Sequence, residues 1–373
     1  MGRLTFAGLE TRPGQVWGQI RLVPLVRERP VEGLRIHPGA LADTGTPRDG
    51  CWYVPHGLTA EWTGDGSGVP ELGTALRMPT TTVHGSRRPR AKSKFGERRT
   101  RVRFVPRRGA LETYLPIAFK APVIAWEEWS TRAFRHGIAP QPDRTHLGFL
   151  VDGLGDALRV FEIHPGQCGV LVYVADALSG VLVTPHPDDY RALHPTLIED
   201  SYGELIWRYS MLYHSAPEFE PRLDASEVDS IADLRAQVAA VQRDWAEFHD
   251  GTLAGGLLGP DYHFAEAYAM AGFRLVRYRP SFSAGTETHV GEAILDAKGR
   301  PAFLQSFRLS ETQVRRGRLL EALAANEWHL DRTADHLGLT RPALVALLHN
   351  SGLDWMLRRD VVDRELAARR RGQ

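Results

Sequence analysis

The sequence predicts an α+β fold, with a mixed or mainly antiparallel sheet and packed helices in the body and a small all-α unit at the C-terminal end. Three patterns predict it: apolar runs separated by turn residues between 158 and 184, an amphipathic pattern over 231–248, and three short helical patterns over 311–352. The chain has 373 residues, of which 43% are hydrophobic and 24% are charged. This balance is typical of folded proteins and argues against a wholly disordered or fibrous chain.

Residues 1–154 are predicted to form a β-rich N-terminal part. Its first strand pattern, over 17–27, contains Pro24, which lacks a backbone donor and therefore favours an edge strand. The glycine- and proline-rich sequence up to about residue 80 predicts short strands and turns. Residues 126–136 are predicted to be helical.

Residues 155–310 are predicted to form the main α+β region. The runs within 158–184 predict a central hairpin or meander, and residues 187–213 predict a helical stretch. A further helix is predicted because apolar residues recur at spacings of three and four, at Ile231, Leu234, Val238, Val241, Trp245 and Phe248. Because this repeat lasts only about two and a half heptads, we expect it to pack on its own sheet rather than to form a coiled coil.

Residues 311–373 are predicted to contain three helices and a basic tail. The second helix is short and is followed by Gly338, at a position that suits a left-handed backbone conformation. Thr340 is predicted to cap the third helix, whose first turn contains Pro342. The small Ala334 allows the two helices to approach closely, which a helix-turn-helix requires.

This segment resembles the Fis-type helix-turn-helix family over about 40 residues. The matching positions are Asn326, Leu330, Ala334, Leu337-Gly338-Leu339, Thr340-Arg341, Leu344 and Leu348. The resemblance implies binding of double-stranded DNA by a homodimer, with the third helix in the major groove. It implies that Thr340 and Arg341 face base edges or phosphate and that Arg332 and Thr333 approach the DNA backbone.

The third helix departs from the family pattern, because Val345, Ala346 and Leu347 stand where basic or hydrogen-bonding residues are usual. Its remaining polar groups include His349, and Arg358 and Arg359 follow it. Since nonspecific affinity depends on the number of phosphates neutralised, one copy of this weakly charged surface is expected to bind DNA poorly. The alternative is a helical bundle that dimerises or docks a protein partner through its apolar third helix.

The charge distribution is asymmetric along the chain, although the formal net charge is only +1. Residues 84–109 are strongly basic, and the segment 188–261 is comparably acidic. The basic run predicts either a polyanion-binding loop or a solvated loop that faces the acidic segment. Its candidate phosphate-binding residues are Arg87, Arg88, Arg90, Lys92, Lys94, Arg98 and Arg99.

The body resembles the ARPP domain, a family named for its association with ADP-ribosylglycohydrolase and rhodanese-phosphatase proteins. The resemblance depends on Gly166-Gln167-Cys168-Gly169 before an apolar run and on Leu197-Ile198-Glu199-Asp200-Ser201-Tyr202. It covers roughly residues 155–310, and the part from 16 to 129 resembles the beginning of the same domain more weakly. The resemblance implies the cellular context of the protein more than a particular reaction.

Histidines and carboxylates in the body are candidates for proton transfer or metal binding: His164, Gln167, His186, Asp188, Asp189, His194, Glu199 and Asp200. Their spacing fits no HExxH, EF-hand or phosphate-loop motif, so we predict neither a metal site nor a cofactor. Cys51 and Cys168 have no metal-ligand spacing and predict buried thiols.

The first residues lack an apolar signal region, and no segment reaches the length of a membrane-spanning helix, so we expect a cytoplasmic protein without a membrane span. The favoured hypothesis is a DNA-binding bacterial regulator whose body senses a ligand or partner. One alternative is an enzyme or effector acting on a nucleotide-derived metabolite. Another is a non-catalytic component of a bacterial conflict or defence system, with the tail as an assembly module.

Overall fold

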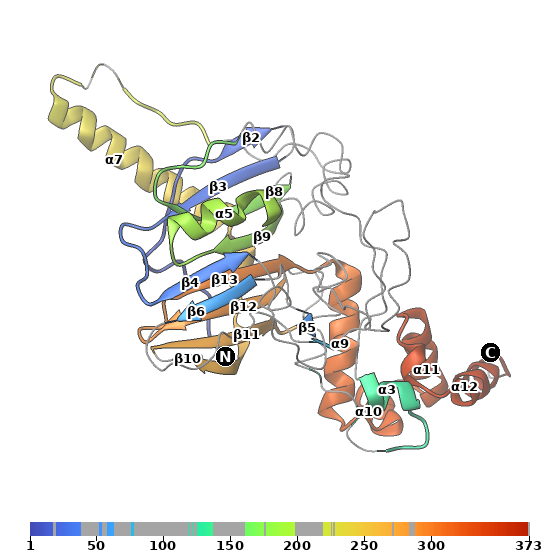
Figure 1. Cartoon of the computed structure of the whole chain (residues 1–373). Coiled ribbons are helices and arrows are strands. Elements are labelled where there is room, and N and C mark those ends of the chain that lie inside the picture. The colour runs from blue at the N-terminus through green and yellow to red at the C-terminus, as the bar shows by residue number, and fades with distance from the viewer. Residues whose placement is uncertain are drawn as a thin grey trace, which may run out of the picture. The chain divides into compact units, whose positions relative to one another are not determined.

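The computed structural model in Figure 1 divides into two compact units. The first comprises Met1–Pro106, Arg144–Pro280 and Glu287–Arg308, and the second comprises Arg107–Asp143, Ser281–Thr286 and Leu309–Gln373. The structure describes residues 1–17, 20–38, 52–53, 58–62, 76–77, 119, 122, 125–136, 161–174, 177–197, 219–224, 226, 228–270, 272–282 and 288–371. The basic run 84–109 lies outside these residues.

The first unit is built on one antiparallel sheet of nine strands among the described residues, in the order β1-β3-β8-β9-β13-β12-β11-β10, with β2 also paired to β3. The strands are β1 Glu10–Thr11, β2 Gln15–Trp17, β3 Ile20–Val26, β8 Gln167–Val174, β9 Ala177–Val183, β10 Tyr262–Met270, β11 Phe273–Pro280, β12 His289–Asp296 and β13 Pro301–Arg308. The predicted α+β class is confirmed. The predicted boundary at residue 154 divides this sheet, because β3 pairs with β8.

Pro24 does not place β3 at the edge of the sheet, as the sequence predicted. β3 pairs with β8 on one side and with both β1 and β2 on the other. The Pro24 carbonyl accepts a hydrogen bond from the Arg12 backbone N–H, in the gap between those two short strands. The missing proline donor therefore costs no regular ladder bond, because neither β1 nor β2 pairs with the chain at that point.

The predicted central hairpin is confirmed by β8 and β9, which are antiparallel, with Gly169 opposite Val183. The two strands approach closely at this point, because a Cβ on Gly169 would lie 2.6 Å from the Leu182 carbonyl oxygen. The helical stretch predicted after residue 187 begins as α5, Pro187–Leu197, and its remainder lies outside the described residues. Two further pairs, β4 Leu34–Pro38 with β6 Leu58–Trp62 and β5 Trp52–Tyr53 with β7 Leu76–Arg77, form small separate sheets.

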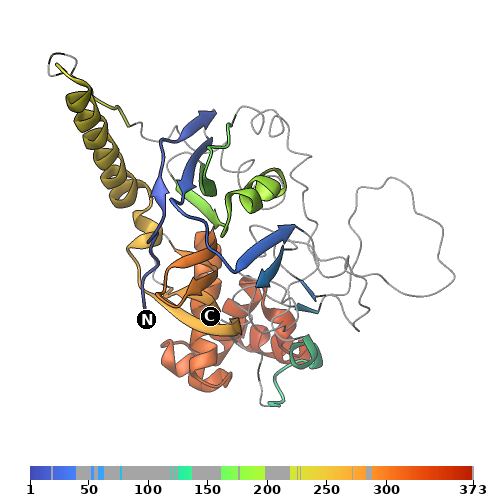
Figure 2. The ribbon, with the colours of Figure 1, turned by 60° about the vertical axis from the view of Figure 1, so that its left-hand side comes forward.

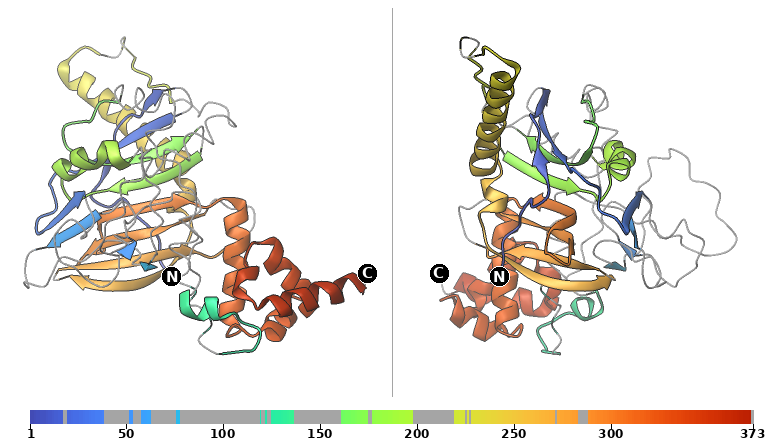
Figure 3. Two further views of the ribbon diagram at one scale, coloured as in Figure 1. Left: turned by 45° about the vertical axis from the view of Figure 1, so that its right-hand side comes forward. Right: turned by 90° about the vertical axis from the view of Figure 1, so that its left-hand side faces the viewer.

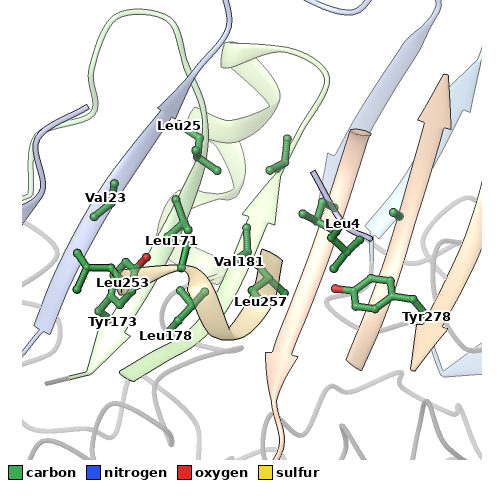
Figure 4. Close-up of a cluster of buried hydrophobic side chains, with 14 of the residues drawn as sticks. Leu4, Val23, Leu25, Leu171, Tyr173, Leu178, Val181, Leu253, Leu257 and Tyr278 are labelled. Atoms are coloured by element: carbon green, nitrogen blue, oxygen red, sulfur yellow. The ribbon is translucent and has the colours of Figure 1, made fainter. Parts of the chain in front are cut away.

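Figure 4 shows the buried core of the first unit, where β3, β8 and β9 contribute Val23, Leu171 and Val181. Leu253 and Leu257 reach the same cluster from two short helical turns, η7 His249–Leu253 and α8 Gly255–Leu258. Every residue of β3 and of β9 is buried, so both faces of these strands are covered, which explains why their sequences are nearly continuous apolar runs rather than alternating ones.

The helix α7, Ile231–Phe248, was predicted at this position and is present, but its packing differs from the prediction. Trp245 is buried, whereas Ile231, Leu234 and Val238 are 72%, 43% and 40% exposed. Figures 1 and 2 show the helix extending away from the sheet over most of its length. The spacing therefore predicted the helix correctly, but only its C-terminal end packs on the core of its own unit.

The second unit contains a bundle of helices, shown from two sides in Figure 3. Its elements are α3 Thr131–His136, α9 Glu311–Ala325, α10 Leu330–His336, α11 Arg341–Asn350, η8 Asp354–Met356 and α12 Arg359–Arg371. Only the last part of the predicted helix 126–136 is helical, because Trp129 forms a β-bridge with Leu357. None of the helices within the described ranges has the length and apolar character needed to cross a membrane.

The segment before α3 is fastened to the C-terminal helices by aromatic and polar contacts. The Trp129 indole N–H donates to the Trp328 carbonyl at 3.0 Å, and the two rings meet edge to face at 5.7 Å. Ser130 donates its hydroxyl to the Trp355 carbonyl at 2.9 Å. Contacts within the second unit therefore include Trp129 and Ser130, which are far from residues 311–373 in the sequence.

Candidate functional site

The turn between α10 and α11 has the backbone that the sequence predicted. Gly338 has φ +67°, the left-handed conformation that favours glycine. The Gly338 N–H donates to the Asp335 carbonyl at 3.1 Å, and the Leu339 N–H donates to the Ala334 carbonyl at 2.9 Å. These bonds satisfy carbonyls at the end of α10 and fix the direction in which the chain enters α11.

Thr340 caps α11, also as predicted. Its side-chain oxygen accepts the Ala343 N–H at 3.4 Å, and Pro342 lies in the first turn. One face of α11 is buried through Leu344, Val345, Ala346 and Leu348. The exposed positions include Thr340, Leu347, His349 and Asn350. The cap and one side of the helix are thus open to solvent, whereas Val345 and Ala346 belong to the core of the unit.

Arg341, predicted to face DNA, is held by three carboxylates. Its Nη2 lies 3.0 Å from Glu128 Oε1, its Nη1 lies 2.9 Å from Asp331 Oδ2, and its Nε lies 3.3 Å from Glu365 Oε1. The last contact is an ion pair without hydrogen-bond geometry. The Arg341 side chain is only 24% exposed. The guanidinium therefore joins α11 to α10, α12 and the segment before α3.

The pKa values of this network show how strongly the charges are coupled. Burial by itself would raise the pKa of Glu128, but a backbone hydrogen bond and the Arg341 guanidinium lower it below its ordinary value. Burial by itself would lower the pKa of Arg341, but the hydrogen bond to Glu128 and the surrounding carboxylates raise it. Both groups are therefore charged at neutral pH.

The two candidate residues of α10 differ in accessibility. Arg332 is 61% exposed and lies 3.1 Å from Glu327. Thr333 is completely buried and donates its hydroxyl to the His329 carbonyl at 2.8 Å. This burial leaves the Thr333 side chain no access to a DNA phosphate, so we exclude it from the contacts proposed below.

The remaining candidates lie at the end of α11 and the start of α12. His349 is 47% exposed and lies 2.9 Å from Asp354, and Arg358 forms two hydrogen bonds with Asp360. Those bonds lower the pKa of Asp360. Arg359 is 95% exposed, and its nearest carboxylate in the described residues, Asp363, is 3.9 Å away. These cations are accessible, but each has an acidic neighbour.

The candidate polar residues of the body that the structure describes form hydrogen bonds with nearby side chains or with the backbone. Asp189 is buried and accepts hydrogen bonds from Arg35 Nε at 2.8 Å and from the Ile36 N–H at 2.9 Å, which joins α5 to β4. Gln167 accepts the His164 N–H and donates to the Gly169 carbonyl, which closes the turn before β8. These contacts stabilise the fold.

Neither His194 of α5 nor His186, which directly precedes this helix, is surrounded by a set of acids among the described residues, although His186 Nδ1 lies 3.4 Å from Asp188 Oδ2. His186 accepts the Asp188 N–H at 3.1 Å, and His194 Nδ1 lies 2.7 Å from the Tyr190 hydroxyl. Burial lowers the pKa of His194 to about 4, and its Nε2 has no hydrogen-bond partner in the described residues. Glu199 and Asp200 lie outside the described residues. Among those residues that are described, no group of three histidines, cysteines or acids is placed to hold a metal ion.

The structure contains one buried polar cluster that the sequence analysis did not predict, around His249. His249 is fully buried at the end of α7, where its Nε2 lies 2.8 Å from the Tyr173 hydroxyl and its Nδ1 lies 2.8 Å from Asp250 Oδ1. The chain continues from it into η7, a π-helical turn. No sequence motif signals this group, because Tyr173 and His249 are brought together only by packing of η7 on β8.

Comparison with known proteins gives a family but no relative of known activity. No curated protein and no solved structure matches the chain significantly. The family model ARPP-2 matches residues 4–271, which reaches from the segment before β1 to the end of β10. The resemblance seen in the sequence, over 155–310 with a weaker part over 16–129, overlaps this match but begins later and ends later than it does. The match covers more than half of the chain, which therefore belongs to the ARPP-2 family.

Proposed function

We propose that this protein is a DNA-binding regulator, in which an ARPP-2 body responds to a ligand or partner and α10 and α11 act as a helix-turn-helix of a homodimer. The observation that supports the proposal most directly is the turn with Gly338 at φ +67°, followed by the exposed cap Thr340. This backbone presents the beginning of α11 to solvent, as a recognition helix requires.

In the proposed complex, the cap end of α11 enters the major groove, with Thr340 near base edges. Arg332, Arg358 and Arg359 bind phosphates and exchange their carboxylate neighbours for them. This exchange costs little because exposed ion pairs contribute only about 0–1 kcal/mol. Arg341 acts as a positioning residue, since its three carboxylates hold α11 against its neighbours.

The acidic neighbours predict weak binding by a single protomer. Asp331 is 52% exposed beside Arg341, and Asp335 is exposed on α10. Both would repel phosphate, so useful affinity requires two modules on successive half-sites. The body would then regulate binding through the spacing of the two modules in the dimer.

The proposal is tested by fluorescence anisotropy of the full chain with a labelled duplex over a range of salt concentrations. Replacement of Arg332, Arg358 and Arg359 by Gln is expected to weaken binding and to reduce the salt slope by about 1 for each phosphate that is no longer neutralised. Arg315→Gln is the matched control, because Arg315 is an exposed, ion-paired arginine on α9 of the same unit. An unchanged slope in the triple variant would contradict the proposed surface.

A second candidate is a protein-docking module, and the exposure of Leu347 favours it. This side chain is 40% exposed on α11 while most of its apolar neighbours are buried. Leu347→Glu separates the two functions, because it would abolish protein docking through this face. In the DNA complex the same change adds a single negative charge and weakens binding without removing the phosphate contacts.

A further inference from the structure

A pocket lies at one end of the main sheet, far in sequence from α10 and α11. The loop after β3, the β10–β11 turn and the β12–β13 turn enclose an open pocket of about 570 Å³, together with residues 7–8. These loops meet because β3 ends, β12 ends and β11 and β13 begin at the same end of the antiparallel sheet. The volume falls within the range of about 300–1,000 Å³ that small-molecule sites occupy.

Four cations line this pocket, and three of them have no acidic partner among the described residues. Arg300 is paired with Asp296 at 2.8 Å, and Asp296 also accepts the backbone N–H groups of Lys298 and Arg300. Asp296 is therefore bound by groups of its own turn. Arg27, Arg29 and Lys298 have no carboxylate within ion-pair distance in the described part of the chain. Glu28 and Glu32 also line the pocket, and both are exposed.

Arg27 is the most constrained of these cations. Its Nη2 donates to the carbonyls of Pro301 and Ala302, and its Nε is buried without a hydrogen-bond partner in the described residues. Burial lowers the pKa of Arg27, which shows that its charge is poorly compensated. Cys168 is close to it, but burial raises the pKa of this thiol to about 11, so it is neutral at physiological pH. Asp296, which is paired with Arg300, also favours the charged form of Arg27, but Arg27 forms no ion pair with a carboxylate among the described residues, so this oriented positive charge is only partly compensated.

The pocket also has an apolar side. Phe273, Pro30, Val31 and Pro301 line it beside the cations. Phe273 begins β11, and its backbone position is fixed by pairing with Asp296 of β12. An inorganic ion would fill only a small part of this volume and would leave these side chains uncovered.

We propose that this pocket binds a small organic anion, with its phosphate or carboxylate between Arg27, Arg29 and Lys298 and its apolar portion against Phe273. The site would supply the ligand-sensing role of the body, but its existence does not depend on DNA binding by the second unit. Fixed cations favour such a ligand because charge-assisted hydrogen bonds are stronger than those between neutral groups.

Isothermal titration calorimetry of the full chain tests the proposal, with phenyl phosphate as the probe. Phenyl phosphate is expected to bind more tightly than inorganic phosphate, which lacks the ring, and more tightly than benzyl alcohol, which lacks the charge. Benzoate, as a further arm, distinguishes a carboxylate site from a phosphate site. Absence of binding by both ring-bearing anions at millimolar concentration would overturn the proposal.

Substitutions of the exposed residues Arg29 and Lys298 avoid the risk that the Arg27→Gln variant fails to fold. Arg29→Gln and Lys298→Gln are each expected to weaken binding about fivefold or more, and Lys298→Arg is expected to retain it. Arg191→Gln is the matched control, because Arg191 is an exposed arginine on α5 outside the pocket. Equal affinities in Arg29→Gln, Lys298→Gln and Arg191→Gln would exclude this site. A wild-type chain that binds the probe but not the DNA duplex, or the duplex but not the probe, identifies which of the two proposals has failed.

Discussion

At the scale of single residues, His194 shows how burial turns a polar side chain into a pH-dependent part of the fold. It is 5% exposed, and the Tyr190 hydroxyl is a hydrogen-bond partner on its own helix. Burial favours the neutral imidazole and lowers the pKa to about 4. The sequence marked this histidine as a candidate for proton transfer, but that role requires a group able to gain a proton near neutral pH.

We predict that the stability of the first unit decreases as the pH falls from about 6.5 to about 4. The folded state keeps His194 neutral, whereas the unfolded chain binds a proton over this range, so stability is present above the unfolded pKa and is lost as the pH approaches the folded pKa. The contribution is about 3 kcal/mol. Urea unfolding at several pH values measures it. His194→Phe is expected to flatten the profile, and an equal slope in both proteins would contradict the assignment.

At the scale of secondary structure, α7 shows that hydrophobic spacing determines a helix but not how much of it is covered. The same spacing that predicted the helix gives Trp245, which packs against Phe219 with ring centroids 5.3 Å apart, and Leu234, which is 43% exposed. The pattern is identical along the helix, so only the position of the sheet decides which residues are buried.

We predict that two substitutions on this helix lower the free energy of unfolding by different amounts. Trp245→Ala is expected to destabilise the first unit by about 3–5 kcal/mol, because it leaves a cavity in the core. Leu234→Gln is expected to change stability by less than about 0.5 kcal/mol, because it replaces an exposed side chain. Chemical denaturation of both variants gives the comparison. A large destabilisation by Leu234→Gln would mean that the apolar stripe is covered in solution.

The elements of the second unit were predicted more completely than its contacts. Local signals such as Gly338 and Thr340 determine the turn and the cap, because both act on the backbone within a few residues. The partners of Arg341 were not predictable in this way. Glu128 is 213 positions away in the sequence, and no local pattern connects it with α11.

At the scale of the whole molecule, the structure divides into two compact units whose segments alternate in the sequence. The Arg341 network and the Trp129–Trp328 contact make residues 125–136 part of the C-terminal unit. A fragment that begins at residue 311 lacks these partners. Tests of the C-terminal helices therefore require the full chain with point substitutions.

We predict that Glu128→Gln lowers the stability of the second unit by about 1 kcal/mol at neutral pH, because it removes one charge from a partly buried network. The lowered pKa of Glu128 means that its stabilisation is present above its ordinary pKa and is lost as the pH falls through the lowered value. The wild type should therefore lose more stability than the variant below about pH 4.5. Hydrogen exchange of the α11 amides measures the stability difference at neutral pH and its change with pH. Identical pH profiles of the wild type and the variant would exclude a role for Glu128.

The sequence by itself determined the α+β class, the central hairpin, the helix α7, and the turn and cap of α11. Each depends on periodicity or on backbone preferences that act over a few neighbouring residues. Tertiary structure alone decided that β3 is flanked on both sides, that Thr333 is buried, that Arg341 binds three carboxylates, and that Arg27, Arg29 and Lys298 line one pocket. These features depend on which distant segments meet, and contacts between distant segments leave no local signal in the sequence.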